Sequence, residues 1–377
     1  MNAPDHSVRA HAYLSCSSSE RWLNCTVAPS LEAKFSDEGS SFASEGTEAH
    51  ELGERSLITK KDTQHVAGKY PAEMREYIQQ YVDYVLDLAH GADHLIVEER
   101  LDISAWVPEC FGTSDAIVID NDTIHVIDLK YGKGIKVFPE HNTQLMLYAL
   151  GTFDAFDAIY GPITNIVTHI VQPRLDHVAS WSISAEDLLA WGESIKPIAQ
   201  MAFSGEGTAK PGDHCHFCKA RHTCRARFDA NLNLAKVEFG DMPKGAELQD
   251  GELAEIYPQL DGFVRWANDL QTYCLVRAEA GEKLKGLKLV EGRSIRKIKD
   301  ELAAATRLRE TGMDDYEFMS MKLKGITELE KSLGKQKFSE VLGELIVKPA
   351  GKPVLVTEAD PRPELSGVST AQADFNE

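Results

Sequence analysis

The sequence predicts an α/β fold, with a mixed central sheet flanked by helices and a mainly helical region after it. Three observations lead to this prediction. Residues 112–130 have the alternating apolar pattern of a β-hairpin, and residues 141–202 alternate between helical and strand patterns. Residues 229–280 instead repeat apolar side chains at helical spacing. We therefore expect domains at 1–228 and 229–355, and a disordered tail at 356–377.

The individual elements follow from local patterns in chain order. Before the hairpin we expect a short helix that ends at Cys25, a polar loop at 35–44, a helix that opens near residue 45, an amphipathic helix at 70–89 and a strand at 94–101. Asn121-Asp122 supplies the turn of the hairpin. After it we expect a helix at 141–157, strands at 165–172 and 181–183, and a helix at 185–202. Later elements are a short strand at 287–290 and helices at 301–311, 315–321, 326–333 and 335–345.

Charge and composition exclude some classes of protein. The formal net charge is −19, which argues against a generally basic protein that coats nucleic acid. It leaves room for a nuclease, because a metal-dependent site needs carboxylates and its DNA contact can be confined to one groove. No apolar run approaches the length of about 18 residues that a membrane helix needs. The N-terminus lacks a secretory signal, so we expect a cytoplasmic protein.

A candidate site lies at one end of the predicted hairpin. Asp115 and Asp128 bracket the hairpin, and Lys130 projects on the same face as Asp128 because residues two apart on a strand point the same way. Two acids and a lysine at an open sheet end suit Mg²⁺ or Mn²⁺, which prefer oxygen ligands. An Asp-x-Lys pattern also occurs by chance at strand ends, so these three residues alone leave the question open.

Three further residues bear on this site. His50 lies among glutamates on a predicted helix, where it is either an exposed histidine that balances acids or a metal ligand directed toward Asp115 and Asp128. Gln144 and Tyr148 are four residues apart and share one face of the predicted 141–157 helix.

The seven cysteines indicate a second metal site. The number is odd and three are clustered as Cys215, Cys218 and Cys224, a C-x2-C-x5-C pattern that in a reducing compartment favours metal binding over disulfides. Zinc or an iron–sulfur cluster would suit these thiolates. The candidates for a fourth ligand are Cys25, Cys16, His214, His216 and His222, and we favour Cys25. Cys110 and Cys274 are expected to be small buried side chains.

The order of these motifs resembles a known family. A helical His, an Asp, an Asp-x-Lys, a Gln-x3-Tyr and a C-x2-C-x5-C with a lone upstream cysteine resemble the RecB-type branch of the PD-(D/E)XK nucleases. The iron–sulfur members, CRISPR-associated RecB-like and AddB-type nucleases, are the most similar. The segments SSSERWLNC, EGTEAHEL and LKLVEGRSIRK also resemble a phage and prophage family encoded near replication and recombination genes. The residue before Asp115 is Ser114 where the family name has proline.

The resemblance implies a restriction-endonuclease-like fold and a set of roles. His50, Asp115 and Asp128 would bind the catalytic Mg²⁺ or Mn²⁺, and Lys130 would orient or activate the attacking water. Gln144 and Tyr148 would contact DNA or support the site. Four cysteines would hold a [4Fe–4S] cluster, with Zn²⁺ as the alternative: Cys25, Cys215, Cys218 and Cys224.

Together these features predict a metal-dependent DNA nuclease in a bacterial host cell. We expect an exonuclease that resects DNA in phage recombination, with DNA and a phage single-strand annealing or single-strand-binding protein as partners and no membrane association. Two alternatives stay open. One is a structure-specific endonuclease with the same site, and the other is an inactive DNA-binding or assembly module whose metal is structural.

Overall fold

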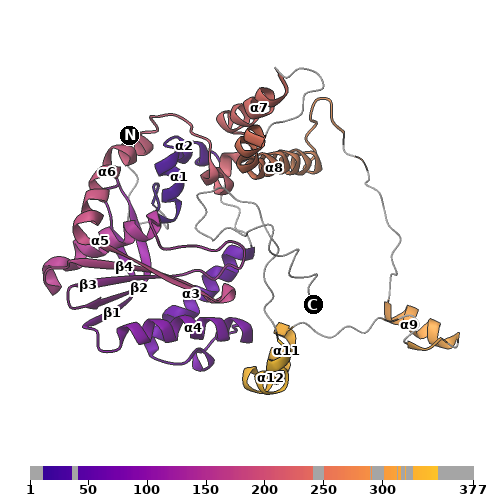
Figure 1. Ribbon diagram of the computed structural model, residues 1–377, viewed down its shortest axis with the longest axis horizontal. Helices are drawn as coiled ribbons and strands as arrows, with labels where there is room; N and C mark the ends of the chain where they lie inside the picture. The colour runs from indigo at the N-terminus through magenta and orange to yellow at the C-terminus, as the bar shows by residue number, and fades with distance from the viewer. Residues whose placement is uncertain are drawn as a thin grey trace. The chain divides into compact units, whose positions relative to one another are not determined.

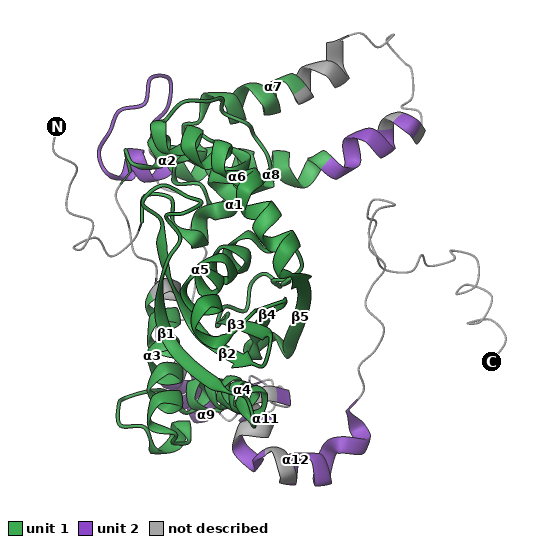
Figure 2. Cartoon of the chain, turned by 90° about the vertical axis from the view of Figure 1, so that its left-hand side faces the viewer, with its two compact units in different colours: residues 1–250, 259–274 green, residues 251–258, 275–377 purple. Residues whose placement is uncertain are grey.

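The computed structural model describes residues 12–35, 41–240, 250–288, 290, 301–311, 313–315, 319 and 326–346. The chain divides into two compact units (Figure 2). Unit 1 comprises Met1–Asp250 with Gln259–Cys274, and unit 2 comprises Gly251–Pro258 with Leu275–Glu377. Unit 1 contains the sheet and every candidate site residue, so the description below concentrates on it.

A five-stranded mixed sheet forms the centre of unit 1, which confirms the predicted α/β fold (Figure 1). The strands lie in chain order: β1 (His94–Asp102), β2 (Phe111–Asp120), β3 (Thr123–Leu129), β4 (Asn165–Gln172) and β5 (His177–Ser184). β3 and β4 are parallel, whereas the other neighbouring strands are antiparallel. The parallel pair requires a crossover connection, and the chain between β3 and β4 contains a long helix.

The β2–β3 hairpin forms where the sequence predicts it. Asp120 pairs with Thr123, so Asn121 and Asp122 make a two-residue turn. Asn121 adopts a φ of 54°, a left-handed conformation that asparagine tolerates better than most residues. The turn fixes the register, and the register places Asp115 and Asp128 toward the opposite end of the hairpin.

Helices cover both faces of the sheet (Figure 1). Two form one apolar core with the sheet: α5 (Thr143–Tyr160) and α6 (Ala185–Ser204). Two others form a second core on the opposite face: α3 (Ser41–Thr59) and α4 (Ala72–Ala89). Unit 1 also contains short helices and turns: α1 (Ser19–Asn24), α2 (Ala28–Glu32) and 3₁₀ turns at Cys16–Ser18, Thr63–His65, Pro173–Leu175, Asp213–Phe217 and Lys219–His222. The central strands β2, β3 and β4 are thus mostly buried, whereas the edge strands β1 and β5 are partly exposed.

Partway along β1, alternate side chains change from facing one core to facing the other. Val97 packs against the second core, whereas Leu101 lies in the first, although residues four apart on a regular strand share a face. The β1–β2 register stays in phase across this point, from His94–Ile119 to Asp102–Phe111. Glu98, with a φ of 52°, lies where the exchange occurs. The outer part of the β1–β2 hairpin is therefore rotated relative to the rest of the sheet.

Some predicted elements differ from the structure. Helix α3 begins at Ser41, so the end of the loop predicted at 35–44 is helical. β5 is longer than the predicted strand at 181–183. The described residues 287, 288 and 290 are not in a strand, contrary to the prediction for 287–290.

The chain after β5 and α6 is helical, as predicted. Its α-helices within the described residues are α7 (Arg225–Gly240), α8 (Asp250–Glu279), α9 (Glu301–Glu310), α11 (Ile326–Leu333) and α12 (Lys335–Leu342), followed by a 3₁₀ turn at Gly343–Leu345. The predicted tail at 356–377 and most of the predicted helix at 315–321 lie outside the described residues. Within the described part of the chain, every helix falls short of the length or apolarity that crossing a membrane requires.

Candidate metal centres

Asp115 and Asp128 meet where β2 and β3 separate. The last residue pair of the hairpin at this end is Ala116–Ile127, and Asp115 and Asp128 follow it on their respective strands. One carboxylate oxygen of Asp115, Oδ2, accepts a hydrogen bond of 2.7 Å from the backbone N–H of Leu129. This bond takes the place of a backbone hydrogen bond between β2 and β3. It holds the Asp115 side chain across the opening between the strands.

Lys130 and Gln144 surround the buried carboxylate of Asp128. Lys130 Nζ donates to Asp128 Oδ1 at 3.2 Å and to Gln144 Oε1 at 3.0 Å, while Gln144 Nε2 lies 3.3 Å from the same Oδ1. Oδ2 of Asp128 is 2.9 Å from Lys130 Nζ, but the geometry of this ion pair is not that of a hydrogen bond. Oδ2 is thus a buried carboxylate oxygen that accepts no hydrogen bond, and the adjacent Lys130 ammonium balances its charge.

The charges of this pair depend on each other. Burial raises the pKa of Asp128, and the ammonium of Lys130 opposes that rise. Burial acts to lower the pKa of Lys130, but the charge of Asp128 outweighs it and the net pKa of Lys130 is raised. Lys130 is therefore held in its cationic form beside the acid.

The structure places His50 beside Asp115. Ala49 and Leu52 bury one face of α3 in the second core, and His50 between them reaches the end of the sheet. Its Nδ1 lies 3.1 Å from Asp115 Oδ1. Burial acts to lower the pKa of His50, but the hydrogen bond with Asp115 raises it above the ordinary value. The imidazole and both acids thus converge on the open end of the sheet.

Glu98 is a site residue that the sequence analysis did not identify. It falls opposite Asp115 in the register of β1 and β2, between the pairs Val97–Ala116 and Glu99–Ser114. One ligand atom each from Glu98, His50 and Asp115 lie within 4.8 Å of one another. Burial, followed by the charge of Asp115, raises the pKa of Glu98 to about 7. The signal available in the sequence was an acid in a strand beside the hairpin, but its partner depends on a register that the sequence does not reveal.

Gln144 and Tyr148 lie on one face of α5, as their spacing predicts. Gln144 Nε2 is 3.2 Å from the hydroxyl oxygen of Tyr148, which is buried against the first core. Burial raises the pKa of Tyr148 strongly, so the phenol stays neutral. In this structure Tyr148 therefore supports Gln144, and Gln144 in turn holds Lys130 and Asp128.

Four cysteines line a small cavity in unit 1. Cys25 follows the last residue of α1, while the other three come from the turns and the helix start after α6: Cys215, Cys218 and Cys224. The backbone N–H of Lys219 donates to Glu32 Oε1 at 2.8 Å, which joins the two segments independently of the thiols. Burial raises the pKa of Cys218 to about 12. Such a thiol would ionise at neutral pH only beside a cation such as a metal.

The other predicted candidates for the fourth ligand are placed differently. Cys16 Sγ lies 3.8 Å from Cys110 Sγ, within the first core. His214 lines the cysteine cavity, and its hydrogen bond with Cys25 raises its pKa. His216 packs against the ring of Phe217, and His222 stacks on Tyr273. Cys25 and His214 are thus the candidates that the fold brings to the cluster.

The remaining cysteines can be compared with the predictions. Cys110 is buried, as predicted. Cys274 is only half-buried, which corrects its assignment as a buried side chain, because its position on α8 leaves part of its surface open.

One comparison with solved structures and one with protein families complete the description. A structure titled "Crystal structure of SSO0001" is 16% identical over 58% of this chain and 89% of its own, with a TM-score of 0.30. A family model described as "Protein of unknown function (DUF2800)" matches residues 11–363. That match covers most of the sequence, and this protein therefore belongs to the DUF2800 family.

Proposed function

We propose that this protein is a divalent-metal-dependent deoxyribonuclease of the RecB-type PD-(D/E)XK class. The observation that carries the proposal is the convergence of Asp115, Asp128 and Lys130 at the splayed end of β2 and β3, with Oδ2 of Asp128 buried and without a hydrogen bond. Two converging acids whose mutual repulsion a divalent cation would relieve, together with a lysine, suit metal-dependent phosphodiester hydrolysis.

The residues at this end of the sheet fit Mg²⁺ or Mn²⁺. Asp115, Asp128 and His50 would hold the cation, and Glu98 adds a carboxylate whose ligand atom lies within 4.8 Å of those of His50 and Asp115. When bound, the cation would supply Lewis-acid polarisation of the phosphodiester and help to ionise water. Asp115 is oriented in advance by the N–H of Leu129, so this ligand need not reorganise when the ion arrives.

Lys130 would act on the substrate. Asp128 and Gln144 hold its ammonium in one position, and its raised pKa keeps it charged. A fixed positive charge beside the scissile phosphate stabilises the negative charge that develops in the transition state, and the same N–H groups can orient the attacking water. Gln144 and Tyr148 serve as positioning residues for Lys130.

The loop after Lys130 would contact the DNA backbone. Gln172 anchors it by accepting from the N–H of Val137 at 2.8 Å and donating to the carbonyl of Ile135 at 2.9 Å. The anchored loop presents Lys133 and Lys136 to solvent directly after the site. In a protein with a net charge of −19, two exposed lysines beside the site give the local attraction that phosphate needs.

We further propose that Cys25, Cys215, Cys218 and Cys224 bind a [4Fe–4S] cluster that ties the start of the chain to residues 215–224. Four thiols around one cavity fit a tetrathiolate site. The cavity volume of about 20 Å³ suits a single ion, so a cluster requires the thiols to move apart, and Zn²⁺ is the alternative ligand. Iron, acid-labile sulfide and zinc measured on anaerobically purified protein distinguish the two.

The biological role that we propose is exonucleolytic resection of DNA in phage recombination, with a single-strand annealing or single-strand-binding protein as partner. The test is a time course on end-labelled linear DNA and covalently closed circular DNA with Mg²⁺, Mn²⁺ or EDTA. We expect metal-dependent loss of the linear DNA alone, and no cleavage by Asp115→Ala or Asp128→Ala.

Each other outcome has a distinct meaning. Cleavage of closed circular DNA would indicate an endonuclease on the same site. Full cleavage by either aspartate variant would refute the site assignment. Absence of cleavage with both metals, in protein whose cysteine metal content is intact, would indicate a binding or assembly module.

A further inference from the structure

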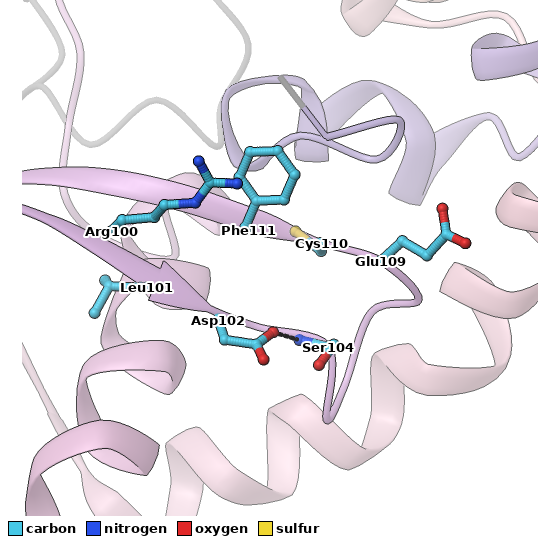
Figure 3. Close-up of a pocket in the computed structure, with 7 residues that line it drawn as sticks. All are labelled: Arg100, Leu101, Asp102, Ser104, Glu109, Cys110 and Phe111. Carbon is cyan, nitrogen blue, oxygen red and sulfur yellow. Dashed lines mark hydrogen bonds between the residues drawn. The ribbon is translucent and has the colours of Figure 1, made fainter. Parts of the chain in front are cut away.

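A second feature of unit 1 lies beyond the metal ligands, on the outer part of the β1–β2 hairpin. An open cavity of about 550 Å³ is lined there by residues of both strands and the loop that joins them: Arg100, Leu101, Asp102, Ser104, Glu109, Cys110 and Phe111 (Figure 3). Its volume is within the range of small-molecule sites, which is about 300–1,000 Å³. None of the roles assigned above to the metal sites uses this cavity.

Arg100 and Phe111 form a flat platform at one side of the cavity. Arg100 pairs with Thr113 and Phe111 with Asp102, so the two side chains are diagonal neighbours across the strands. The guanidinium carbon of Arg100 lies 4.0 Å from the centroid of the Phe111 ring (Figure 3). Among the described residues, no carboxylate forms an ion pair with Arg100. A planar cation stacked on an aromatic ring, and open to solvent, is a surface on which another planar group can stack.

The platform is exposed because, at Glu98, the side chains of β1 change which core they face. Beyond Glu98, Leu101 faces the first core, and a Cβ on Gly112 would lie 2.7 Å from Tyr148. The intervening residues, including Arg100 and Phe111, therefore face away from that core. Arg100 is two residues from Glu98 along β1, a separation of about 7 Å. The platform thus lies within about one nucleotide of the proposed ligands.

The charges that line the cavity favour the bases of DNA over its phosphates. Two of its lining residues are acids, Asp102 and Glu109, against one cation. Carboxylates repel phosphate but accept hydrogen bonds from the amino groups of bases. Bases in a duplex are stacked on each other, so a base can lie on a protein platform only when its strand is single.

We infer that Arg100 and Phe111 form a nucleobase-stacking subsite that holds single-stranded DNA next to the cleavage site. The inference rests on the proposed nuclease function and adds the substrate class to it. The end of the strand enters with a base on the platform, while its phosphates pass toward Lys130. A fully paired duplex has no free base for this subsite.

The test measures binding of 12-nucleotide single strands by fluorescence anisotropy in EDTA, which withholds divalent cations and prevents cleavage. In each strand one position is abasic, and that position moves along the series. We expect wild-type protein to lose at least about fivefold in affinity at one or two positions, since stacking contributes about 1–3 kcal/mol per base. Phe111→Leu should bind the intact strand as weakly as wild-type protein binds the strand that is abasic at the critical position. Its affinity should no longer depend on where the abasic position lies. Phe111→Trp should retain the wild-type affinity for the intact strand and the wild-type dependence on the abasic position.

Matched variants keep the result interpretable. Arg100→Lys preserves the charge but not the plane, so we expect an intermediate loss for single strands and unchanged duplex binding. Val178→Ala, at an exposed position on β5 at the other edge of the sheet, should behave as wild type. Unfolding midpoints verify that each variant is folded.

Three results would overturn the inference. These are an abasic series with no effect on wild-type binding, the same abasic losses in Phe111→Leu as in wild type, or equal weakening of single-strand and duplex binding. Because binding is measured in EDTA, its outcome is independent of cleavage. A wild-type protein that degrades DNA in Mg²⁺ but fails these criteria refutes the stacking subsite and leaves the nuclease proposal standing.

Discussion

The open end of the sheet and the cysteine cluster are both candidate metal centres, but the fold holds their ligands in different ways. At the sheet end the acids have partners within the protein, because Leu129 and His50 hold Asp115 while Lys130 and Gln144 hold Asp128. The cysteines instead lie at the end of the six-residue helix α1 and on short turns almost two hundred residues later. Such turns have few hydrogen bonds of their own to fix a side chain.

This difference indicates at which centre the folded structure would depend on a bound metal. The protein's own hydrogen bonds already hold the acids at the sheet end, so a divalent cation bound there would matter more for chemistry than for holding the fold together. The cysteines come from two segments that are distant in sequence, so a metal bound there would close a long loop, and its binding free energy would become folding free energy. The predictions below test each side of this comparison, beginning with the largest expected effect.

Lys130→Met should lower the rate of DNA cleavage about 10²- to 10³-fold and leave Mn²⁺ affinity equal or higher. The variant removes the fixed charge that faces the substrate, and with it a cation that competes for Asp128. Single-turnover cleavage and calorimetric Mn²⁺ titration measure the two effects. Lys133→Met, the same change in the neighbouring loop, should weaken DNA binding at low salt and spare the single-turnover rate. Loss of Mn²⁺ binding in Lys130→Met would show that the lysine only maintains the site's structure.

Cys25→Ser should lose most of the bound metal and lower the unfolding free energy by at least about 2 kcal/mol. The substitution removes one of the four thiols around the cavity. The metal would then no longer link the end of α1 to residues 215–224. Metal content and denaturant unfolding measure both effects. Cys16→Ser is the matched control, since Cys16 contacts Cys110 instead, and it should retain the metal. Retention of metal by Cys25→Ser would move the fourth ligand to His214.

Glu98→Gln should lower the affinity for Mn²⁺ about ten- to a hundredfold and change the unfolding midpoint little. The substitution keeps the shape of the side chain and removes one of three converging ligand groups. Glu99→Gln, at the next position of β1, is the control and should bind Mn²⁺ as wild type does. Equal Mn²⁺ affinity in Glu98→Gln and wild type would mean that this glutamate is not a ligand.

How much the sequence could predict differs between these residues for physical reasons. The hairpin and the spacing of Asp128 and Lys130 are local properties, because the turn at Asn121 and strand alternation determine them. The sequence favoured Cys25 over Cys16 as the fourth ligand but could not decide between them, because the path of the short helix and turns between the two cysteines determines which one reaches residues 215–224. Glu98 was missed because its left-handed φ and its position opposite Asp115 depend on tertiary pairing. The roles of all these residues stay predictions.

The smallest expected effect concerns a chain of hydrogen bonds that runs from α4 to the strands β4 and β3 and requires neutral side chains. Tyr84 OH lies 2.8 Å from His169 Nδ1, and His125 Nδ1 lies 3.0 Å from His169 Nε2. Burial, and then His125, lower the pKa of His169 from 6.5 to about 3. Because this folded-state pKa is depressed, the neutral histidine favours the folded state above pH 6.5, and that stability is lost as the pH falls below it.

The loss should reach about 2 kcal/mol at pH 5, since each pH unit below the unfolded-state pKa is worth about 1.36 kcal/mol. Urea unfolding of wild type and His169→Gln between pH 8 and pH 5 measures it, and the variant should show a flatter dependence. His65→Gln, whose side chain is 74% exposed, should keep the wild-type slope. If His169→Gln kept the full slope, groups elsewhere would carry the acid sensitivity.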